Sequence, residues 1–469
     1  MHGPGGYLGG ISTALLAVFA ADLLSAPASA QNAAPDAAGI PADSIARNLP
    51  ANGDPDGRRK ALAERGITYG INYASDLQSN IAGGLRRRAS YMGKLEVLVD
   101  IDLEKLSGLR GLSFHANAFQ YHGHGLTGSS INSLMAVSYL EANASTRLSE
   151  LWLEQKFAGD KATFRFGQLA ADSEFFISSY GTQFINATFG WPAITGSNLP
   201  SGGPAAPLST PGVRLKVDPD KSLSLLAAVF NGDPAGPGPG DPQVRNPHGL
   251  NFRVQDPPLV MGEMQYRVNQ DKGDKGLAGS YKLGAWSHFG SFDDQRFGTD
   301  GLSLANPISN GRPIQLRGNH GVYGVIDQQI WRPPSGEPDK GVGLFARASA
   351  SPDDRNLISG YVDGGIVFAG LIAARPDDVV SFGAAYAKIS NRARGLDADS
   401  LAATGTGFVR NYEATFDANY QAQILPGWQM DLDLQRITHP SGGNIDATNP
   451  TAAAIPDATV LTLHTSIKY

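Results

Sequence analysis

A short segment between residues 171 and 192 combines aromatic rings with carboxylate and amide groups. Its candidate binding residues are Asp172, Glu174, Phe175, Phe176, Asn186 and Trp191. An aromatic ring can pack on the apolar C–H face of a sugar, while carboxylate and amide oxygens accept hydrogen bonds from its hydroxyls. The segment therefore predicts contacts with a carbohydrate. The alternative for Phe175, Phe176 and Phe189 is that these rings only anchor the segment to the protein wall.

Charged side chains on other segments add to this candidate site. Arg165 and Gln168 precede it, and Arg165 alternates with Phe164 and Phe166, which places Arg165 on the opposite face of an extended chain. Further residues expected on the same inner face are Lys94, Glu96, Glu150, Glu154, Glu263, Arg267, Asp327 and Arg347. Opposed acidic and basic groups offer donors and acceptors to hydroxyls. The alternative is that these charges pair with one another and brace the wall.

Catalytic interpretations of the sequence are weaker. Asp431 and Asp433 are two residues apart on one predicted strand, about 7 Å along it, which does not exclude glycoside hydrolysis. His122 and His124 resemble a pair of metal ligands, but a position at a loop tip explains them better, and the chain has no cysteine. No triad, phosphate-binding glycine loop or zinc motif stands out. We therefore expect no enzyme, no cofactor and no metal, with hydrolysis as a remote alternative.

Composition narrows the class of protein further. Charged residues make up 17% of the 469 residues and the formal net charge is −6, which argues against nucleic acid as a partner. The one basic run, Arg86–Arg88, falls in a predicted loop, where it faces solvent or lipopolysaccharide or steers a solute. No window after residue 30 has eighteen consecutive apolar residues, so no transmembrane helix is expected. A membrane protein of this composition must cross the bilayer as a closed barrel.

The elements that position these residues are expected to be sixteen short strands between residues 66 and 469, joined alternately by tight turns and long loops. The tight turns are expected near residues 107–109, 159–160, 218–220, 271–276, 332–340, 375–378 and 425–427. The long loops are expected near residues 82–89, 123–146, 173–211, 232–258, 292–318, 351–358, 391–408 and 438–458. Outer-membrane barrels have short turns at the periplasmic rim and long loops at the outer rim. This alternation of tight turns and long loops predicts an all-β transmembrane outer-membrane barrel of about sixteen antiparallel strands.

Alternation along the predicted strands supports this fold. Residues 411–423 place apolar and aromatic side chains on one face and only polar side chains on the other. The pattern recurs in residues 428–435 and in residues 94–103, where Leu98 is the exception. Because it appears near both ends of the chain, a water-filled lumen explains it better than the surface of a soluble sheet. The chain also ends on an aromatic residue, Tyr469, as many bacterial barrels do.

The first 65 residues are expected to lie outside the barrel. Residues 1–30 contain a short apolar core and a small-residue cleavage site, which predict a signal peptide for export to the outer membrane. Residues 31–53 are rich in Ala, Pro, Asp and Asn and predict a disordered segment. Residues 54–65 predict a short helix at the periplasmic mouth, with Asp54 as its N-cap. The porin domain then covers residues 66–469.

Several stretches of the chain, from about residue 55 to its end, resemble the carbohydrate-selective porin (OprB-like) family. They are Gly167-Gln168, Asp172–Phe176, Phe184–Pro192, Gly321–Gly324, Asp327-Gln328, Gly343–Arg347, Asp363–Gly365, Arg375–Asp378 and Gln435–Gly443. One departure is Asp54–Gly57, where we expect the family to have a tryptophan before the glycine. In sixteen-stranded porins the third long loop, here residues 173–211, folds inward and narrows the pore.

The resemblance implies an outer-membrane porin through which mono- or oligosaccharides diffuse passively into the periplasm. A general, non-selective diffusion porin is the alternative. The expected partners are carbohydrate solutes, outer-membrane lipid and lipopolysaccharide. The sequence leaves open which sugar passes and whether the protein is a monomer or a homotrimer.

Overall fold

The computed structural model describes residues 39–41, 43–271, 273–334, 337, 339–445 and 454–469. These residues form sixteen antiparallel strands in one closed barrel, in which β1 pairs with β16. The strands are β1 (Ile67–Ala82), β2 (Arg88–Asp102), β3 (Leu112–Gly123), β4 (Ser145–Phe157), β5 (Ala162–Leu169), β6 (Thr210–Val217), β7 (Leu223–Asn231), β8 (Pro258–Val268), β9 (Gly279–Gly298), β10 (Pro313–Trp331), β11 (Gly341–Ala350), β12 (Ile358–Ala369), β13 (Val379–Ile389), β14 (Tyr412–Leu425), β15 (Trp428–Thr438) and β16 (Ala458–Lys468). The predicted sixteen-stranded all-β fold is confirmed. The predicted signal peptide, residues 1–30, lies outside the described residues.

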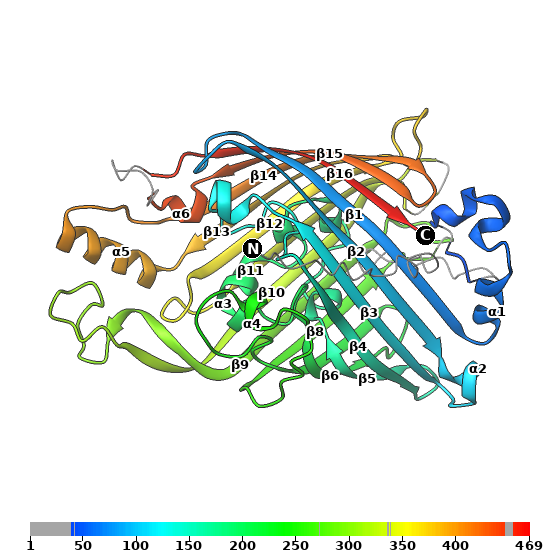
Figure 1. Cartoon of the computed structure of the whole chain (residues 1–469), viewed down its shortest axis with the longest axis horizontal. Helices are drawn as coiled ribbons and strands as arrows, with labels where there is room; N and C mark the ends of the chain where they lie inside the picture. The colour runs from blue at the N-terminus through cyan, green and yellow to red at the C-terminus, as the bar shows by residue number, and fades with distance from the viewer. Residues whose placement is uncertain (1–38, 42, 272, 335–336, 338, 446–453) are drawn as a thin grey trace, which may run out of the picture.

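The two ends of the barrel differ in their connections (Figure 1). One end carries α5 (Asn391–Thr404) and α6 (Pro440–Gly443) together with long loops. The other end carries α1 (Arg58–Glu64), α2 (Leu103–Ser107) and the C-terminus. Because outer-membrane barrels keep their short turns on the periplasmic side, the end with α1 faces the periplasm.

The segment before the barrel is more ordered than the sequence suggested. We expected disorder over residues 31–53, but residues 45–53 fold into two 3-10 turns, η1 (Ile45–Asn48) and η2 (Pro50–Gly53). The end of the chain stabilises them, because the Tyr469 hydroxyl donates a hydrogen bond of 2.6 Å to the Gly53 carbonyl. A tertiary contact of this kind cannot be read from the composition of the segment itself.

Helix α1 begins at Arg58, later than the predicted start at residue 54. Gly57 precedes it with a φ of 66°, a conformation that favours glycine. The Asp54 carboxylate accepts hydrogen bonds from the backbone N–H groups of Arg59 and Lys60, at 3.0 and 3.1 Å. Asp54 therefore satisfies free N–H groups of the first turn, as an N-cap would, from outside the helix.

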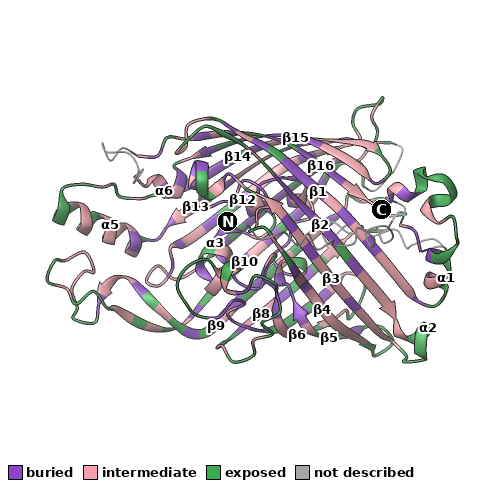
Figure 2. Ribbon diagram, viewed as in Figure 1, coloured by how far each residue is buried: buried purple, intermediate pink, exposed green. Residues whose placement is uncertain are grey.

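The two faces of the strands differ as predicted, and burial varies along them (Figure 2). On β14 and β15, Phe416 and Leu432 point outward and are each 53% exposed, whereas Asp417 and Asp433 point inward and are buried. On β2, the exception Leu98 lies on the inner face and is buried. Apolar side chains thus face the lipid and polar side chains face the interior, which confirms the barrel wall.

Among the loops at the outer end, L1 (residues 83–87) connects β1 to β2, L2 (residues 124–144) connects β3 to β4, and L3 (residues 170–209) connects β5 to β6. L2 and L3 contain short helical turns, and the remaining helix lies between β7 and β8. These elements are η3 (Thr127–Ile131), η4 (Ala171–Ser173), η5 (Gly181–Gln183), η6 (Ala187–Phe189), α3 (Ala193–Asn198), η7 (Pro200–Gly202) and α4 (Pro242–Arg245). No helix of the described residues is long and apolar enough to cross a bilayer.

Helix α5 falls where the sequence predicted only a long loop. Ser390 caps its first turn by accepting a hydrogen bond from the backbone N–H of Ala393, and Gly405 ends it with a φ of 70°. Two ion pairs link it to β9: Arg296 donates two hydrogen bonds to Asp399, at 2.8 and 2.9 Å, and Arg392 lies 3.7 Å from Asp294. The helix has no continuous apolar stripe, so hydrophobic periodicity could not reveal it.

Candidate functional site

L3 leaves β5 and runs inside the barrel, where it contacts the inner wall from β7 to β15. Arg347 on β11 is the most connected anchor. Its guanidinium donates to three L3 carbonyls, those of Phe176, Thr188 and Gly190, at 2.8–2.9 Å. It also pairs with Asp363 on β12, and neither side chain of this pair is exposed. Arg347 therefore fixes L3 to the wall.

Aromatic packing reinforces this attachment. Phe176 stacks on Tyr323 of β10 with ring centroids 4.1 Å apart, and Phe175 meets the edge of Phe230 on β7. Glu263 of β8 accepts hydrogen bonds from the Phe176 N–H at 2.8 Å and the Tyr323 hydroxyl at 2.7 Å. The two phenylalanines are 1% and 0% exposed, so they anchor L3.

Polar residues complete the anchoring. Asp327 accepts hydrogen bonds from the Ser178 hydroxyl and the Ser179 N–H of L3. Asn186 donates to Gln435 of β15 at 2.9 Å. We predicted that Phe175, Phe176, Asn186, Asp327, Arg347 and Gln168 contact a solute or line the constriction, with anchoring of L3 as the alternative for the two phenylalanines. All six side chains are buried and bonded or packed within the protein, which favours anchoring.

L2 also folds against the inner wall, which the sequence did not suggest. Glu413 of β14 accepts the N–H groups of Leu134 and Met135, both at 2.8 Å. Near the start of the wall, Asp76 of β1 accepts a hydrogen bond of 2.5 Å from Ser138. L2 and L3 together contact the inner wall from β7 round to β1. On the other side of the barrel, L3 meets β5 and β6 through Glu174.

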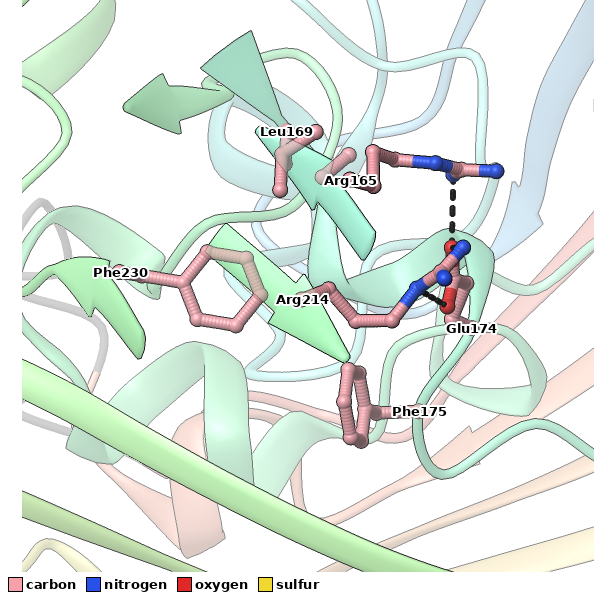
Figure 3. A pocket seen from close by; sticks show the side chains of 7 residues that line it. Arg165, Leu169, Glu174, Phe175, Arg214 and Phe230 are labelled. Atoms are coloured by element: carbon pink, nitrogen blue, oxygen red, sulfur yellow. Dashed lines mark hydrogen bonds and ion pairs between the residues drawn. The ribbon is translucent and has the colours of Figure 1, made fainter. Parts of the chain in front are cut away.

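On β4–β6, two guanidinium groups and two carboxylates form a compact ion-pair belt, defined here as Glu154, Arg165, Glu174 and Arg214. Figure 3 shows three of them, Arg165, Glu174 and Arg214. Arg165 lies 3.0 Å from Glu154 and 2.6 Å from Glu174. Arg214 lies 2.7 Å from Glu154 and 2.6 Å from Glu174. Each arginine thus pairs with one carboxylate from the wall, Glu154, and one carboxylate from L3, Glu174.

Strand register builds the wall side of this belt. Glu154 of β4 is directly opposite Arg165 of β5, and Arg165 is directly opposite Arg214 of β6. Glu174 completes it from L3, just after η4. Burial alone would raise the pKa of the Glu174 carboxyl, but Arg165 and Arg214 outweigh burial and lower that pKa below its usual value. The belt is therefore charged and balanced, with two cations and two anions.

An aromatic platform lies beneath the belt. The Arg165 guanidinium lies 3.7 Å from the ring centroid of Trp152, and Trp152 stacks on His115 with centroids 4.8 Å apart. His115 Nδ1 lies 2.7 Å from an Asp100 carboxylate oxygen. Glu154 and Arg165 were predicted from the sequence, but this platform and Arg214 were not. The alternation of Arg214 with outward-facing Val213 and Leu215, on the strand that follows L3, could have indicated that Arg214 faces inward.

Two other predicted site residues are partly exposed but lie outside the belt. Asp172 accepts a hydrogen bond of 2.9 Å from the Ala206 N–H, and burial raises the pKa of its carboxyl to about 7. The Trp191 indole N–H donates to the Gly202 carbonyl at 3.0 Å, within L3 itself. Of the ten predicted residues, the structure joins only Arg165 and Glu174 in the belt.

A closed barrel with an apolar outside, a polar inside and a lumen narrowed by inward loops defines a porin, a diffusion channel of the bacterial outer membrane. The family model described as "Carbohydrate-selective porin, OprB family" matches residues 86–469. The chain therefore belongs to the OprB family of carbohydrate-selective porins.

Individual proteins agree with this assignment. Porin B of Pseudomonas aeruginosa is 23% identical over 430 residues, which cover 87% of this chain and 90% of Porin B. The high-pH structure of Pseudomonas putida OprB matches with a TM-score of 0.78 at 19% identity, over 89% of this chain and 98% of that one. The low-pH structure of the same protein matches with a TM-score of 0.54 at 15% identity, over 89% and 97%.

Family membership settles the function class. The protein is a carbohydrate-selective porin of the outer membrane, and it is a channel and not an enzyme. The glycoside-hydrolase alternative is therefore discarded. Asp431 and Asp433, the carboxylates that suggested it, are buried in the wall at 4% and 0% exposure.

Proposed function

We propose that the ion-pair belt is the site at which this porin selects sugars. The observation that carries the proposal is the geometry of the belt. Two guanidinium groups and two carboxylates meet where L3 approaches β4–β6, and Arg165, Glu154 and Glu174 keep 13–18% of their side chains exposed, whereas Arg214 keeps 4%. Neighbouring hydroxyls of a sugar ring can accept from the guanidinium groups and donate to the carboxylates at the same time.

The charge balance of the belt favours a neutral solute. A sugar acid or sugar phosphate would have to displace Glu154 or Glu174 from the arginines, which are held at 2.6–3.0 Å. A neutral sugar needs only to share the hydrogen-bonding groups. Apolar solutes of equal size would strip water from the charges without replacing its hydrogen bonds, so they are disfavoured.

The pairing inside the belt also explains how a solute is released. A channel must bind its solute strongly enough to attract it and weakly enough to let it leave. Each arginine already has carboxylate partners, so a sugar exchanges one set of hydrogen bonds for another. Mono- and small oligosaccharides then diffuse passively into the periplasm, while lipid and lipopolysaccharide surround the barrel.

Single-channel conductance in planar bilayers tests this function. We expect glucose or maltose on one side to block the ion current reversibly, and neutral amino acids of similar size to block it far less. In Glu174→Gln the charge balance of the belt is lost, so sugar block weakens and the pore becomes more anion-selective. Equal block by sugars and amino acids would contradict the proposal and favour a general pore.

The control for this experiment is Glu337→Gln, which makes the same chemical change at the periplasmic rim, in the connection between β10 and β11. Sugar block in this variant should equal that of the wild type. If both variants lose sugar block alike, a general change of surface charge explains the effect and the belt is not the selecting site.

A further inference from the structure

The tip of the β1–β2 hairpin carries a cluster of arginines that pore function does not explain. Arg86–Arg88 are exposed, and no carboxylate of the described residues pairs with them. Two carboxylates in neighbouring loops are already engaged. Asp457 pairs with Arg436 at 3.2 Å, and Glu141 accepts the Leu126 N–H at 2.8 Å. The cluster therefore presents a net positive charge.

The backbone of this tip is held on both sides. The Gly84 N–H donates to the Pro456 carbonyl at 2.9 Å, which ties L1 to the connection before β16. The N–H groups of Leu85 and Arg86 both donate to the Ser130 carbonyl of L2, at 2.8 and 3.1 Å. A fixed backbone lowers the entropy lost when a ligand orders the arginine side chains.

A notch in the barrel rim opens beside the arginines. The pairing of β2 with β3 ends at Met92 and Gly123, whereas the pairing of β2 with β1 continues to Arg88. Beyond Met92, β2 keeps β1 as a strand partner, and on the β3 side the ladder gives way to contacts with His124, whose N–H donates to the Tyr91 carbonyl at 3.0 Å. A hollow of about 480 Å³ lies there, lined by Arg88, Gly123, His124, Gly125, Ser129, Ala142, Asn143 and Ala144. The Arg88 guanidinium and the His124 imidazole suit an anionic oxygen ligand.

The height of the notch identifies the source of that anion. Leu77, Ile81 and Tyr91 point outward near the top of the wall and are 54%, 47% and 47% exposed, so lipid chains reach this level. Arg88 is three residues beyond Tyr91, at most about 10 Å along the strand. Because the headgroup layer is roughly 5–7 Å thick on each side of the hydrocarbon, the arginines lie at headgroup height. The hairpin points to the end that carries α5 and α6 (Figure 1), which faces outside.

We propose that Arg86–Arg88 and the adjoining notch bind the phosphate groups of lipopolysaccharide in the outer leaflet. Arginine binds phosphate through two parallel N–H···O bonds, and the His124 imidazole supplies a further polar group in the hollow. The Asn143 amide is already engaged, because it donates to the Asp241 carboxylate. The inference deepens the lipid contact given under the proposed function. It does not depend on sugar selection, because the notch lies at the outer rim and the ion-pair belt lies inside the barrel.

Binding of lipid A to the purified full-length porin in neutral detergent, followed by native mass spectrometry, tests this site. The probes are lipid A with both phosphates, the same lipid A with its phosphates removed, and inorganic phosphate. The test variant is Arg86→Gln/Arg87→Gln/Arg88→Gln. The matched control is Arg58→Gln/Arg65→Gln/Arg110→Gln, which removes the same charge from exposed arginines at the periplasmic end. Heat-modifiable migration on gels verifies that each barrel is folded.

We expect the test variant to bind phosphorylated lipid A about 100-fold more weakly than the wild type, since each of the three basic residues near an anionic surface contributes about fivefold. The control variant should bind as the wild type does. Equal loss in both variants, or equal binding of dephosphorylated lipid A, would overturn the proposal. Full competition by millimolar inorganic phosphate would replace the lipid site by a site for a free anion. Sugar block should be unchanged in the test variant, so failure here leaves the belt untouched.

Discussion

Two sets of arginine–carboxylate pairs lie inside this barrel, and they differ mainly in burial. In the first, Arg347 and Asp363 have no exposed side-chain surface, and Arg347 also holds three carbonyls of L3. In the second, the ion-pair belt, Arg165 and Glu174 remain 17% and 18% exposed. Both sets join the wall to L3. Only the second has surface left for a solute.

The comparison shows how one kind of interaction serves two purposes. A buried pair is satisfied entirely by protein groups, and removing one partner leaves an uncompensated charge in a water-poor site. A partly exposed pair can exchange a protein partner for water or a hydroxyl at little cost. We therefore expect substitutions at the first set to change stability and substitutions at the belt to change selectivity.

Arg347→Ala should have the largest effect. It leaves Asp363 buried without its partner and frees the carbonyls of Phe176, Thr188 and Gly190. Breaking a buried pair in this way costs about 3–5 kcal/mol. Urea unfolding of the barrel in lipid vesicles, followed by tryptophan fluorescence, measures this loss. Single-channel currents should also become noisier, because L3 is released from the wall.

A double variant sharpens this first prediction. Arg347→Met with Asp363→Leu removes both charges, so no buried charge is left unpaired. We expect it to recover part of the free energy of unfolding lost in Arg347→Ala. If Arg347→Ala unfolds at the urea concentration of the wild type, the buried pair does not brace L3 and the comparison fails.

Arg214→Ala should change selectivity by the next largest amount. Arg214 pairs with Glu154 and Glu174, and a hydrogen bond to a charged group contributes about 1.5–3 kcal/mol. Because Arg214 is only 4% exposed, it acts on the sugar by holding these two carboxylates in place, and loss of that hold should weaken sugar block by up to about one to two orders of magnitude. The control is Lys216→Ala on the same face of β6, which removes one charge outside the belt. Equal loss of block in the two variants would show that the belt has no special role.

Phe176→Leu tests the anchoring side with a smaller change. The ring stacks on Tyr323 at a centroid distance of 4.1 Å and is fully buried. Leucine keeps most of the apolar volume but loses the ring contact, worth about 0.5–1.5 kcal/mol. Urea unfolding should show this loss, and sugar block should stay as in the wild type. A large loss of sugar block at unchanged stability would instead return Phe176 to the solute path.

The sequence was sufficient for the wall but not for the interior. Strands are encoded locally, by alternation such as that of Phe416 with Asp417, so their number and order could be predicted. The inner role of Phe176 or Arg347 depends on which side of L3 meets the wall, and this is set by contacts between segments far apart in the chain. The same holds for the inward fold of L2, which depends on Glu413 and Asp76.

Arg165 and Arg214 show where local reasoning ends. Arg165 could be placed on the inner face because phenylalanines flank it. Its neighbour Arg214 lies across a strand pair that is connected only through the whole of L3. A tight turn fixes the register of a hairpin, but a loop of this length does not. The sequence therefore could not predict that these four residues form one belt.

Two carboxylates at the start of L3 extend the comparison to pH. Arg165 and Arg214 hold the pKa of Glu174 below its usual value of 4.5 against the effect of burial, so Glu174 stays ionised throughout the neutral range. Asp172 has no arginine partner among the described residues, and burial raises its pKa to about 7. Asp172 is thus largely neutral below pH 7 and ionised above it.

Asp172→Asn should therefore have the smallest effect, visible only as a change with pH. As the pH rises through about 7, the wild-type pore gains one negative charge, and its preference for cations should increase about twofold, as expected for a partly exposed charge. Reversal potentials measured across a salt gradient report this ratio. The preference for cations should not change with pH in Asp172→Asn. In Glu174→Gln this preference should be shifted by the same amount at every pH in this range. A wild-type curve that is flat through neutral pH would show that Asp172 does not titrate there.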